Sequence, residues 1–132
     1  MTGLDPRYGA EVRRRMATMS GVGDLASGPG VVRVAAGDRE QGAEIVLGAR
    51  IDGDRVVELR FRAFGCPHFI AAASWVTDRL RGASRTDLER WDWQELVTTL
   101  EVPPAKFGRL LTLQDAVRAL ARNWPGALRS TV

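Results

Sequence analysis

The stretch "AEIVLGARIDGDRVVELRFRAF", residues 43–64, decides the fold of this 132-residue chain. Apolar and polar residues alternate along both halves of it, and a period of two is typical of strands with one buried face. Asp52–Gly53–Asp54 separates the halves, and an Asp-Gly pair supplies the positive φ angles of a tight hairpin. We therefore predict an antiparallel hairpin with one buried face and one wet, arginine-bearing face.

The alternation also predicts which side chains point into the core. They are Ile45, Leu47, Ala49, Ile51, Val57, Leu59, Phe61 and Ala63. Glu58, Arg60 and Arg62 then lie on the opposite face of the second strand.

Beyond Gly65 the apolar period changes from two to 3.6, which predicts a helix that ends at Gly82. Two short helices are expected within 84–100, and a long final helix ends near Trp124. A first helix is expected between Asp5 and Gly21. The order helix, strands, helices favours an α+β fold, with helices against one face of an antiparallel sheet.

The stretch 21–43, between the first helix and the hairpin, is rich in glycine and low in periodicity. We expect a flexible loop region there, with one short strand at "VVRV", residues 31–34. No other stretch has the composition of a linker, so we predict a single domain over 1–132.

Composition excludes several classes of protein. The net charge is +3, but acidic residues lie among the basic ones and Arg13–Arg15 is the only basic run, which does not indicate a nucleic-acid binder. No apolar run reaches the roughly 20 residues that span a bilayer. The first 15 residues lack the apolar core of a secretion signal, so we expect a cytoplasmic protein that binds no membrane.

Cys66 and His68 are the only cysteine and the only histidine, and they lie two residues apart at a predicted helix start. Pro67 suits the first turn of that helix, which puts Cys66 near the N-cap, where a thiolate is stabilised. His68 could ligate a metal through a neutral nitrogen. Alternatively, Cys66 is structural, because free cysteine is often buried as a small apolar residue. A metal site is also disfavoured, because Cys66 and His68 supply two of the four ligands that tetrahedral metals take.

Two separated motifs carry a family resemblance. The segment "AFGCPHFIAAASWVTDRLRG", residues 63–82, resembles the second-cysteine segment of the U-type iron–sulfur cluster scaffolds, the IscU and NifU N-terminal family. The segment "LEVPPAKFGRLLTLQDAVRALARNW", residues 100–124, resembles that family's closing segment. With the hairpin and a looser match over 8–25, the resemblance extends from about residue 8 to residue 124. It implies an antiparallel three-stranded sheet packed by helices, the IscU/NifU-N-like sandwich.

The resemblance also implies where cluster ligands would lie. The family's first cysteine corresponds to Gln41, the aspartate two residues on to Ala43, and the histidine–cysteine pair to Gly108 and Arg109. Only the second cysteine is kept, as Cys66. A cluster needs about four thiolate or imidazole ligands, so iron or a cluster would require ligands shared between two chains or brought from outside. A guanidinium at position 109 suits an anion, or a persulfide received from a cysteine desulfurase, better than a metal cation.

One further segment resembles the family's recognition peptide for its dedicated Hsp70-type chaperone. It consists of Val102, Pro103, Pro104, Ala105 and Lys106. Two prolines stiffen an extended backbone, which suits a peptide ligand, although a proline-rich loop between helices explains the same residues. The partners implied are a cysteine desulfurase, the chaperone and, if ligands are pooled, a second copy of the chain.

Three functions remain open from the sequence. The first is a scaffold-like protein of iron–sulfur cluster assembly that handles iron, a cluster or sulfur at Cys66. The second is a cluster-free adapter or modulator of the assembly machinery. The third is an enzyme with Cys66 as nucleophile and His68 as base, which we rank last because no third orienting group is apparent. We therefore predict a protein that is not an enzyme.

Overall fold

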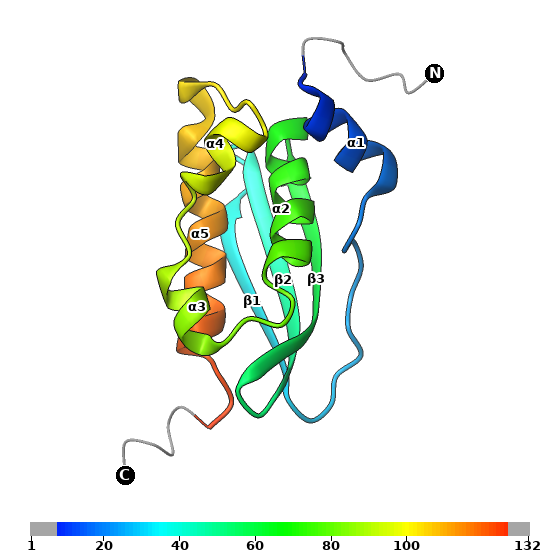
Figure 1. Cartoon of the computed structure of the whole chain (residues 1–132), viewed down its shortest axis with the longest axis vertical. Coiled ribbons are helices and arrows are strands. Elements are labelled where there is room, and N and C mark those ends of the chain that lie inside the picture. The colour runs from blue at the N-terminus through cyan, green and yellow to red at the C-terminus, as the bar shows by residue number, and fades with distance from the viewer. Residues whose placement is uncertain (1–7, 127–132) are drawn as a thin grey trace.

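The computed structural model describes residues 8–126 of the chain. The elements in chain order are α1 (Ala10–Thr18), β1 (Val31–Asp38), β2 (Ala43–Asp52), β3 (Arg55–Gly65), α2 (Pro67–Arg79), α3 (Arg85–Arg90), α4 (Glu95–Thr99), the 3-10 helix η1 (Pro104–Lys106) and α5 (Phe107–Arg122). Helices α2 and α5 lie side by side on one face of the three-stranded sheet (Figure 1). The predicted α+β class and the helix-packed antiparallel sheet are confirmed.

The sheet is ordered β1-β2-β3, and both neighbouring pairs are antiparallel. The predicted hairpin forms β2 and β3, but its two turn residues are Gly53 and Asp54, because Asp52 still pairs with Arg55. Gly53 has a φ of 62°, while Asp54 is not among the residues with positive φ. Glycine therefore supplies the one left-handed residue that the turn requires.

A β-bulge changes the predicted phase at the start of β3. Arg50 pairs with Glu58 while the next residue, Ile51, pairs with Val56, so Val57 is an extra residue without a partner. The prediction that Val57 faces the core is therefore wrong: Val56 is fully buried and Val57 only partly so. One inserted residue moves the flanking side chains to the other face, which explains the error.

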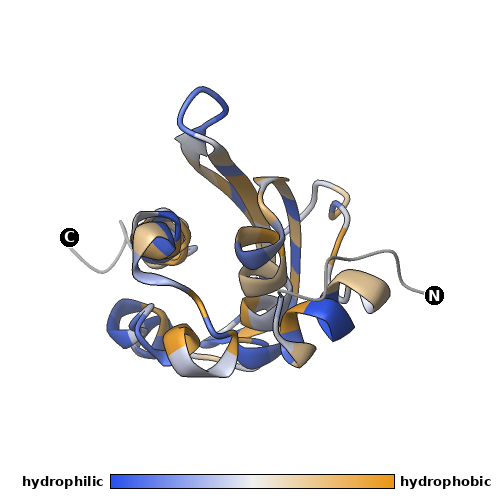
Figure 2. Ribbon diagram, turned by 90° about the horizontal axis from the view of Figure 1, so that it is seen from above, coloured by the Kyte–Doolittle hydropathy of each residue, from blue (hydrophilic) through white to orange (hydrophobic). Residues whose placement is uncertain are grey.

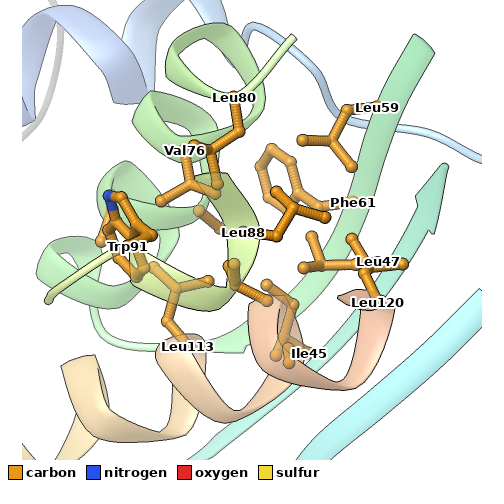
Figure 3. Packing of buried hydrophobic residues seen from close by; sticks show 14 of the residues in the cluster. Ile45, Leu47, Leu59, Phe61, Val76, Leu80, Leu88, Trp91, Leu113 and Leu120 are labelled. Atoms are coloured by element: carbon orange, nitrogen blue, oxygen red, sulfur yellow. The ribbon is translucent and has the colours of Figure 1, made fainter. Parts of the chain in front are cut away.

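The core lies between the sheet and the helices that cover it. Apolar side chains from the strands meet those from α2, α3 and α5, as Figure 3 shows for Leu47, Phe61, Val76, Leu88 and Leu120. Each of these side chains is at most 1% exposed. Bands of hydrophilic and hydrophobic colour alternate along the strands in Figure 2, which is the pattern of a sheet with one face buried.

The segment before β1 is attached to the sheet. The backbone N–H of Gly23 donates to the carbonyl of Phe61, and the N–H of Phe61 donates to the carbonyl of Gly21, both at 2.9 Å. These bonds pair Phe61 at the free edge of β3, where its N–H and carbonyl would otherwise be offered to another strand. Beyond them, Asp24 pairs with Arg62 at 2.7 Å on the wet face of the sheet.

The strand expected over 31–34 is longer than predicted. It continues to Asp38 and pairs with β2 along its whole length, so the expected loop region of 21–43 contains a complete edge strand. The described part of the first helix begins at Ala10, and its predicted start at Asp5 lies outside the described residues. Within residues 8–126, no helix has the length and apolar character needed to cross a bilayer.

Candidate functional site

Four chain segments converge at the end of the sheet where α2 and α5 begin, at the top of Figure 1. Strand β3 ends there, because Gly65 pairs with Ala43, the first residue of β2. The turn between β1 and β2 approaches α5: a Cβ built on Gly42 would lie 3.3 Å from Nη2 of Arg109. The fold therefore brings residues about 65 positions apart in the chain to one place.

A cavity of about 290 Å³ opens at this end of the molecule. It is lined by Gln41, Ala43, Ala105, Gly108, Arg109 and Thr112. All four positions that the family resemblance assigns to lost ligands thus line one cavity. The side chains they present are an amide, a methyl group, a hydrogen atom and a guanidinium, none of which is a usual ligand of iron.

Cys66 lies beside this cavity rather than in its lining. It is the N-cap of α2, with extended backbone, and Pro67 occupies the first position of the helix, as the sequence predicts. The side chain is half-buried and packs against the core, and it makes no capping hydrogen bond. The N-terminus of this 13-residue helix places partial positive charge next to the sulfur.

His68 is buried in the first turn of α2, with 8% of its surface exposed. Its ring packs against Tyr8, with the ring centroids 4.8 Å apart, and its Nδ1 finds no partner in the described part of the chain. Burial, followed by the positive charges of Lys106 and Arg109, lowers the pKa of His68, so the imidazole is neutral at neutral pH. Within residues 8–126, no hydrogen bond joins Cys66 and His68, and a nucleophile with its base would require one.

Arg109 is the charged group of the cavity. Its Nε is buried and has no acceptor, and none of the described carboxylates forms an ion pair with it. Asp38, the last residue of β1, accepts the backbone N–H of Gln41 at 2.8 Å instead, and Glu40 in the β1–β2 turn is exposed. The cavity is therefore positive on the α5 side, which disfavours a metal cation.

The donor set does not fit a cluster held by one chain. Among residues 8–126, no group of three or more histidine, cysteine, aspartate and glutamate side chains is close enough to hold a metal ion. Cys66 and His68 remain the only thiol and imidazole in the whole sequence. A cluster of the usual kind would need two further ligands at least.

The proline segment is less extended than predicted. Pro103 has extended backbone, but Pro104–Lys106 form η1, and the N–H of Lys106 donates to the carbonyl of Pro103 at 2.9 Å. The prediction of an extended peptide over all five residues is therefore wrong. Val102 is buried in the core, whereas Pro103, Pro104 and Ala105 are exposed beside the cavity.

Thr112 is a lining residue that was not predicted from the sequence, and Ala105, which also lines the cavity, was expected only in the chaperone-recognition segment. Thr112 lies one helical turn after Gly108 and donates its hydroxyl to the Gly108 carbonyl at 3.3 Å. Residues four apart on a helix share a face, so the spacing from Gly108 was the available signal.

Known proteins resemble this chain in sequence and in fold. The family model of the NifU-like N terminal domain matches residues 8–129. The "Iron sulfur cluster assembly protein 1, mitochondrial" of Eremothecium gossypii is 30% identical over 81 residues, which cover 61% of this chain and 53% of that protein. The "Iron-sulfur cluster assembly scaffold protein IscU" of Rickettsia prowazekii is 30% identical over 73 residues, 55% of this chain and 56% of that one. The chain thus spans about half the length of the curated relatives it matches.

A crystal structure shows the same fold. It is that of the N-terminal part of a nitrogen-fixing NifU-like protein from Brucella abortus, with a TM-score of 0.68 and 16% sequence identity. The match covers 86% of this chain and 91% of that one. At this identity the likeness concerns the arrangement of strands and helices and not the chemistry of the site.

Proposed function

The chain belongs to the NifU-like N-terminal domain family, and from this premise we propose that it acts in iron–sulfur cluster assembly as a scaffold-like protein that handles sulfur at Cys66. The observation that carries the proposal is the set of four family ligand positions around one cavity, where Gln41, Ala43, Gly108 and Arg109 supply no metal ligand. A single chain then retains a thiol for sulfur but lacks the ligand set for a cluster.

The role in assembly is supported by the relatives. The two relatives described above are named for iron–sulfur cluster assembly, and one of them is named a scaffold. The cargo of such a protein would be sulfur alone, or iron and a cluster only if a second chain or an external thiol contributes ligands.

The chemistry proposed at Cys66 is the transfer of one sulfur atom. The Cys66 thiolate attacks the outer sulfur of a persulfide on a cysteine desulfurase, the S–S bond of that persulfide breaks, and the desulfurase thiolate leaves. Cys66 then carries the persulfide. The helix N-terminus at Cys66 supports this step, because it places partial positive charge next to the sulfur that becomes the persulfide.

A second candidate is a cluster-free adapter of the assembly machinery. The exposure of Pro103, Pro104 and Ala105 beside the cavity favours it, because a partner such as an Hsp70-type chaperone could reach them. The buried side chain of Val102 would not be available to such a partner.

The test is an anaerobic reaction of the wild type and of Cys66→Ser with a cysteine desulfurase, its cysteine substrate and ferrous iron. Intact mass, bound iron and sulfide, visible absorbance and oligomeric mass are measured together. We expect the colourless wild type to gain the mass of one sulfur atom that a reducing agent removes, and Cys66→Ser to gain none.

Two other results would change the proposal. Cluster absorbance on a dimer, absent in Cys66→Ser, would mean that two chains share ligands and that the family's cluster role persists. Neither sulfur nor cluster on the wild type would leave the adapter function, for which binding of the chaperone to wild type and to Pro103→Ala would be compared.

A further inference from the structure

We propose that the cavity between the β1–β2 turn and α5 is an oxyanion site, in which Arg109, Gln41 and Thr112 bind a phosphate or sulfate group. The inference goes beyond sulfur handling and does not depend on it, because Cys66 is not among the residues that line the cavity.

The first argument is charge. Several exposed arginines of the chain, among them Arg39 and Arg62, are neutralised by a carboxylate at 3.2 Å and 2.7 Å. Arg109 has no such partner among the described residues, and neither has Lys106 three residues before it. The carboxylates nearest in the turn, Asp38 and Glu40, are both exposed, and neither forms an ion pair with Arg109; Asp38 accepts the N–H of Gln41 instead.

The second argument is the unused donor of Arg109. The Nε–H is buried without an acceptor, although a buried charged donor normally has one. A phosphate or sulfate would supply it, since a guanidinium offers parallel N–H groups that match two oxygens of such an anion. The same guanidinium lies against the turn at Gly42, which holds it at the cavity wall.

The third argument is the shape of the lining. Gly108 stands in the first turn of the 16-residue helix α5, and a Cβ built on it would meet nothing within 4 Å, so the cavity is open at the helix N-terminus. The dipole of α5 favours an anion at this end, although the N–H of Phe107 already donates to the Pro104 carbonyl of η1. The amide of Gln41 adds a neutral donor to the same cavity, and the hydroxyl of Thr112 adds another when it turns from the Gly108 carbonyl to the anion.

The size of the cavity limits the ligand. A volume of about 290 Å³ is at the lower end of the range of small-molecule sites. It admits an inorganic oxyanion or a small phosphate monoester, and these two sources present the same group to Arg109. A large nucleotide would have to extend into solvent.

The test is titration of the full chain with sodium phosphate at constant ionic strength, followed by calorimetry and by amide chemical shifts, with sodium chloride as the reference. We expect saturable binding, with the largest shifts at Gln41 and in the first turn of α5. Arg109→Gln should weaken binding at least about tenfold, which corresponds to loss of one charge-assisted hydrogen bond. Thr112→Val, which keeps the shape and removes the hydroxyl, should weaken it less.

The matched control is Arg122→Gln, which removes the same charge from the far end of α5. Phosphate binding that is weakened equally by both arginine substitutions would overturn the proposal, because it would show attraction by net charge alone. Absence of saturable binding to the wild type would overturn it as well. Glycerol 3-phosphate binding more tightly than phosphate would identify a monoester as the ligand, and equal binding would identify the free anion.

The two proposals fail separately. Cys66→Ser should bind phosphate like the wild type while it accepts no sulfur. A wild type that binds phosphate but gains no sulfur overturns the proposed function alone, and one that gains sulfur but binds no phosphate overturns the oxyanion site alone.

Discussion

The helix-covered face of the sheet and the end of the sheet where α2 and α5 begin differ in how closely they follow the family pattern. The covered face presents one large apolar cluster, which includes Ile45 and Leu120. The end of the sheet brings together the positions that the family resemblance assigns to ligands, but four of these five positions hold other residue types. A fold and the chemistry placed on it can therefore change independently.

The physical reason lies in how the two regions contribute to stability. Each core side chain stabilises the fold by removing its apolar surface from water, which contributes about 25 cal/mol for every Å² buried. A residue that lines an open cavity buries little and can be exchanged without loss of packing. Arg109 and Lys106 even place two positive charges near the same end of the sheet, beside the neutral imidazole of His68.

The largest effect is expected when metal-binding side chains are introduced at the four positions that the family resemblance assigns to ligands. A variant with Gln41→Cys, Ala43→Asp, Gly108→His and Arg109→Cys would, with Cys66, offer three thiolates, an imidazole and a carboxylate around one cavity. We expect it to bind one zinc ion per chain with a free energy approaching the roughly 10–16 kcal/mol of four-ligand zinc sites. Metal content and competition with a chelator dye would measure this.

The control adds Cys66→Ser to the four substitutions and should lower the zinc affinity. If the fourfold variant folds but binds no more zinc than the wild type, the five positions do not converge closely enough to form a site. The comparison between a changed chemistry and a kept geometry would then be wrong.

On the covered face, Phe61→Ala should lower the free energy of unfolding by about 3–5 kcal/mol, because it leaves a cavity in the core. Phe64→Ala is the matched control, since Phe64 lies on the same strand but is 43% exposed. It loses mainly the contact with Arg39, whose guanidinium lies 4.8 Å from the ring centroid, and should cost at most about 1 kcal/mol. Urea unfolding measures both, and equal losses would contradict the assignment of faces.

The ion pair between Arg15 and Asp78 joins α1 to α2 and belongs neither to the apolar core nor to the cavity. Arg15 is 7% exposed and donates to Ser74 and to Asp78. Arg15→Met should cost about 2 kcal/mol, because hydrogen bonds to a charged partner are lost. Arg14→Met, which breaks only an exposed pair with Glu11, should cost about 0.5 kcal/mol or less, and a similar loss in both variants would contradict a special role for Arg15.

The same pair predicts a pH dependence. Burial by itself would raise the pKa of Asp78, but hydrogen bonds from Arg15 and Ser20 outweigh it, and the pKa is lowered. The stability it contributes is therefore complete above the ordinary carboxylate pKa and is lost as the pH falls through the lowered value. Unfolding of the wild type and of Arg15→Met should converge at acid pH.

The smallest expected effect is a change in the pKa of His68, at the end of the sheet where α2 and α5 begin. His68 is the only histidine, so its proton NMR titration can be followed without overlap. Removing a neighbouring positive charge favours the protonated imidazole, so Arg109→Gln should raise the lowered pKa of His68 while Arg122→Gln leaves it unchanged. An unchanged pKa in Arg109→Gln would mean that the guanidinium does not act on this end of the molecule.

Much of the fold was predictable because its signals are local. The hairpin, the helix that begins after Cys66 and the order of the later helices follow from periods of two and 3.6 and from turn residues a few positions apart. The phase error at Val57 arose because a bulge is decided by pairing with the opposite strand, and periodicity within one strand does not record it. The length of β1 was underestimated for the same reason, since its small residues from Ala35 to Asp38 are strand only through their pairing with β2.

For the candidate site, too, some features follow from the sequence and others only from the tertiary structure. The sequence by itself determined that one thiol and one imidazole are all the soft ligands this chain has, because composition does not depend on folding. The family resemblance already grouped Gln41, Gly108 and Arg109, and only the tertiary structure decided that they line a cavity, that Thr112 joins them and that Cys66 lies just outside it. Contacts between segments about 65 residues apart depend on how sheet and helices pack, and no pattern within one segment carries that information.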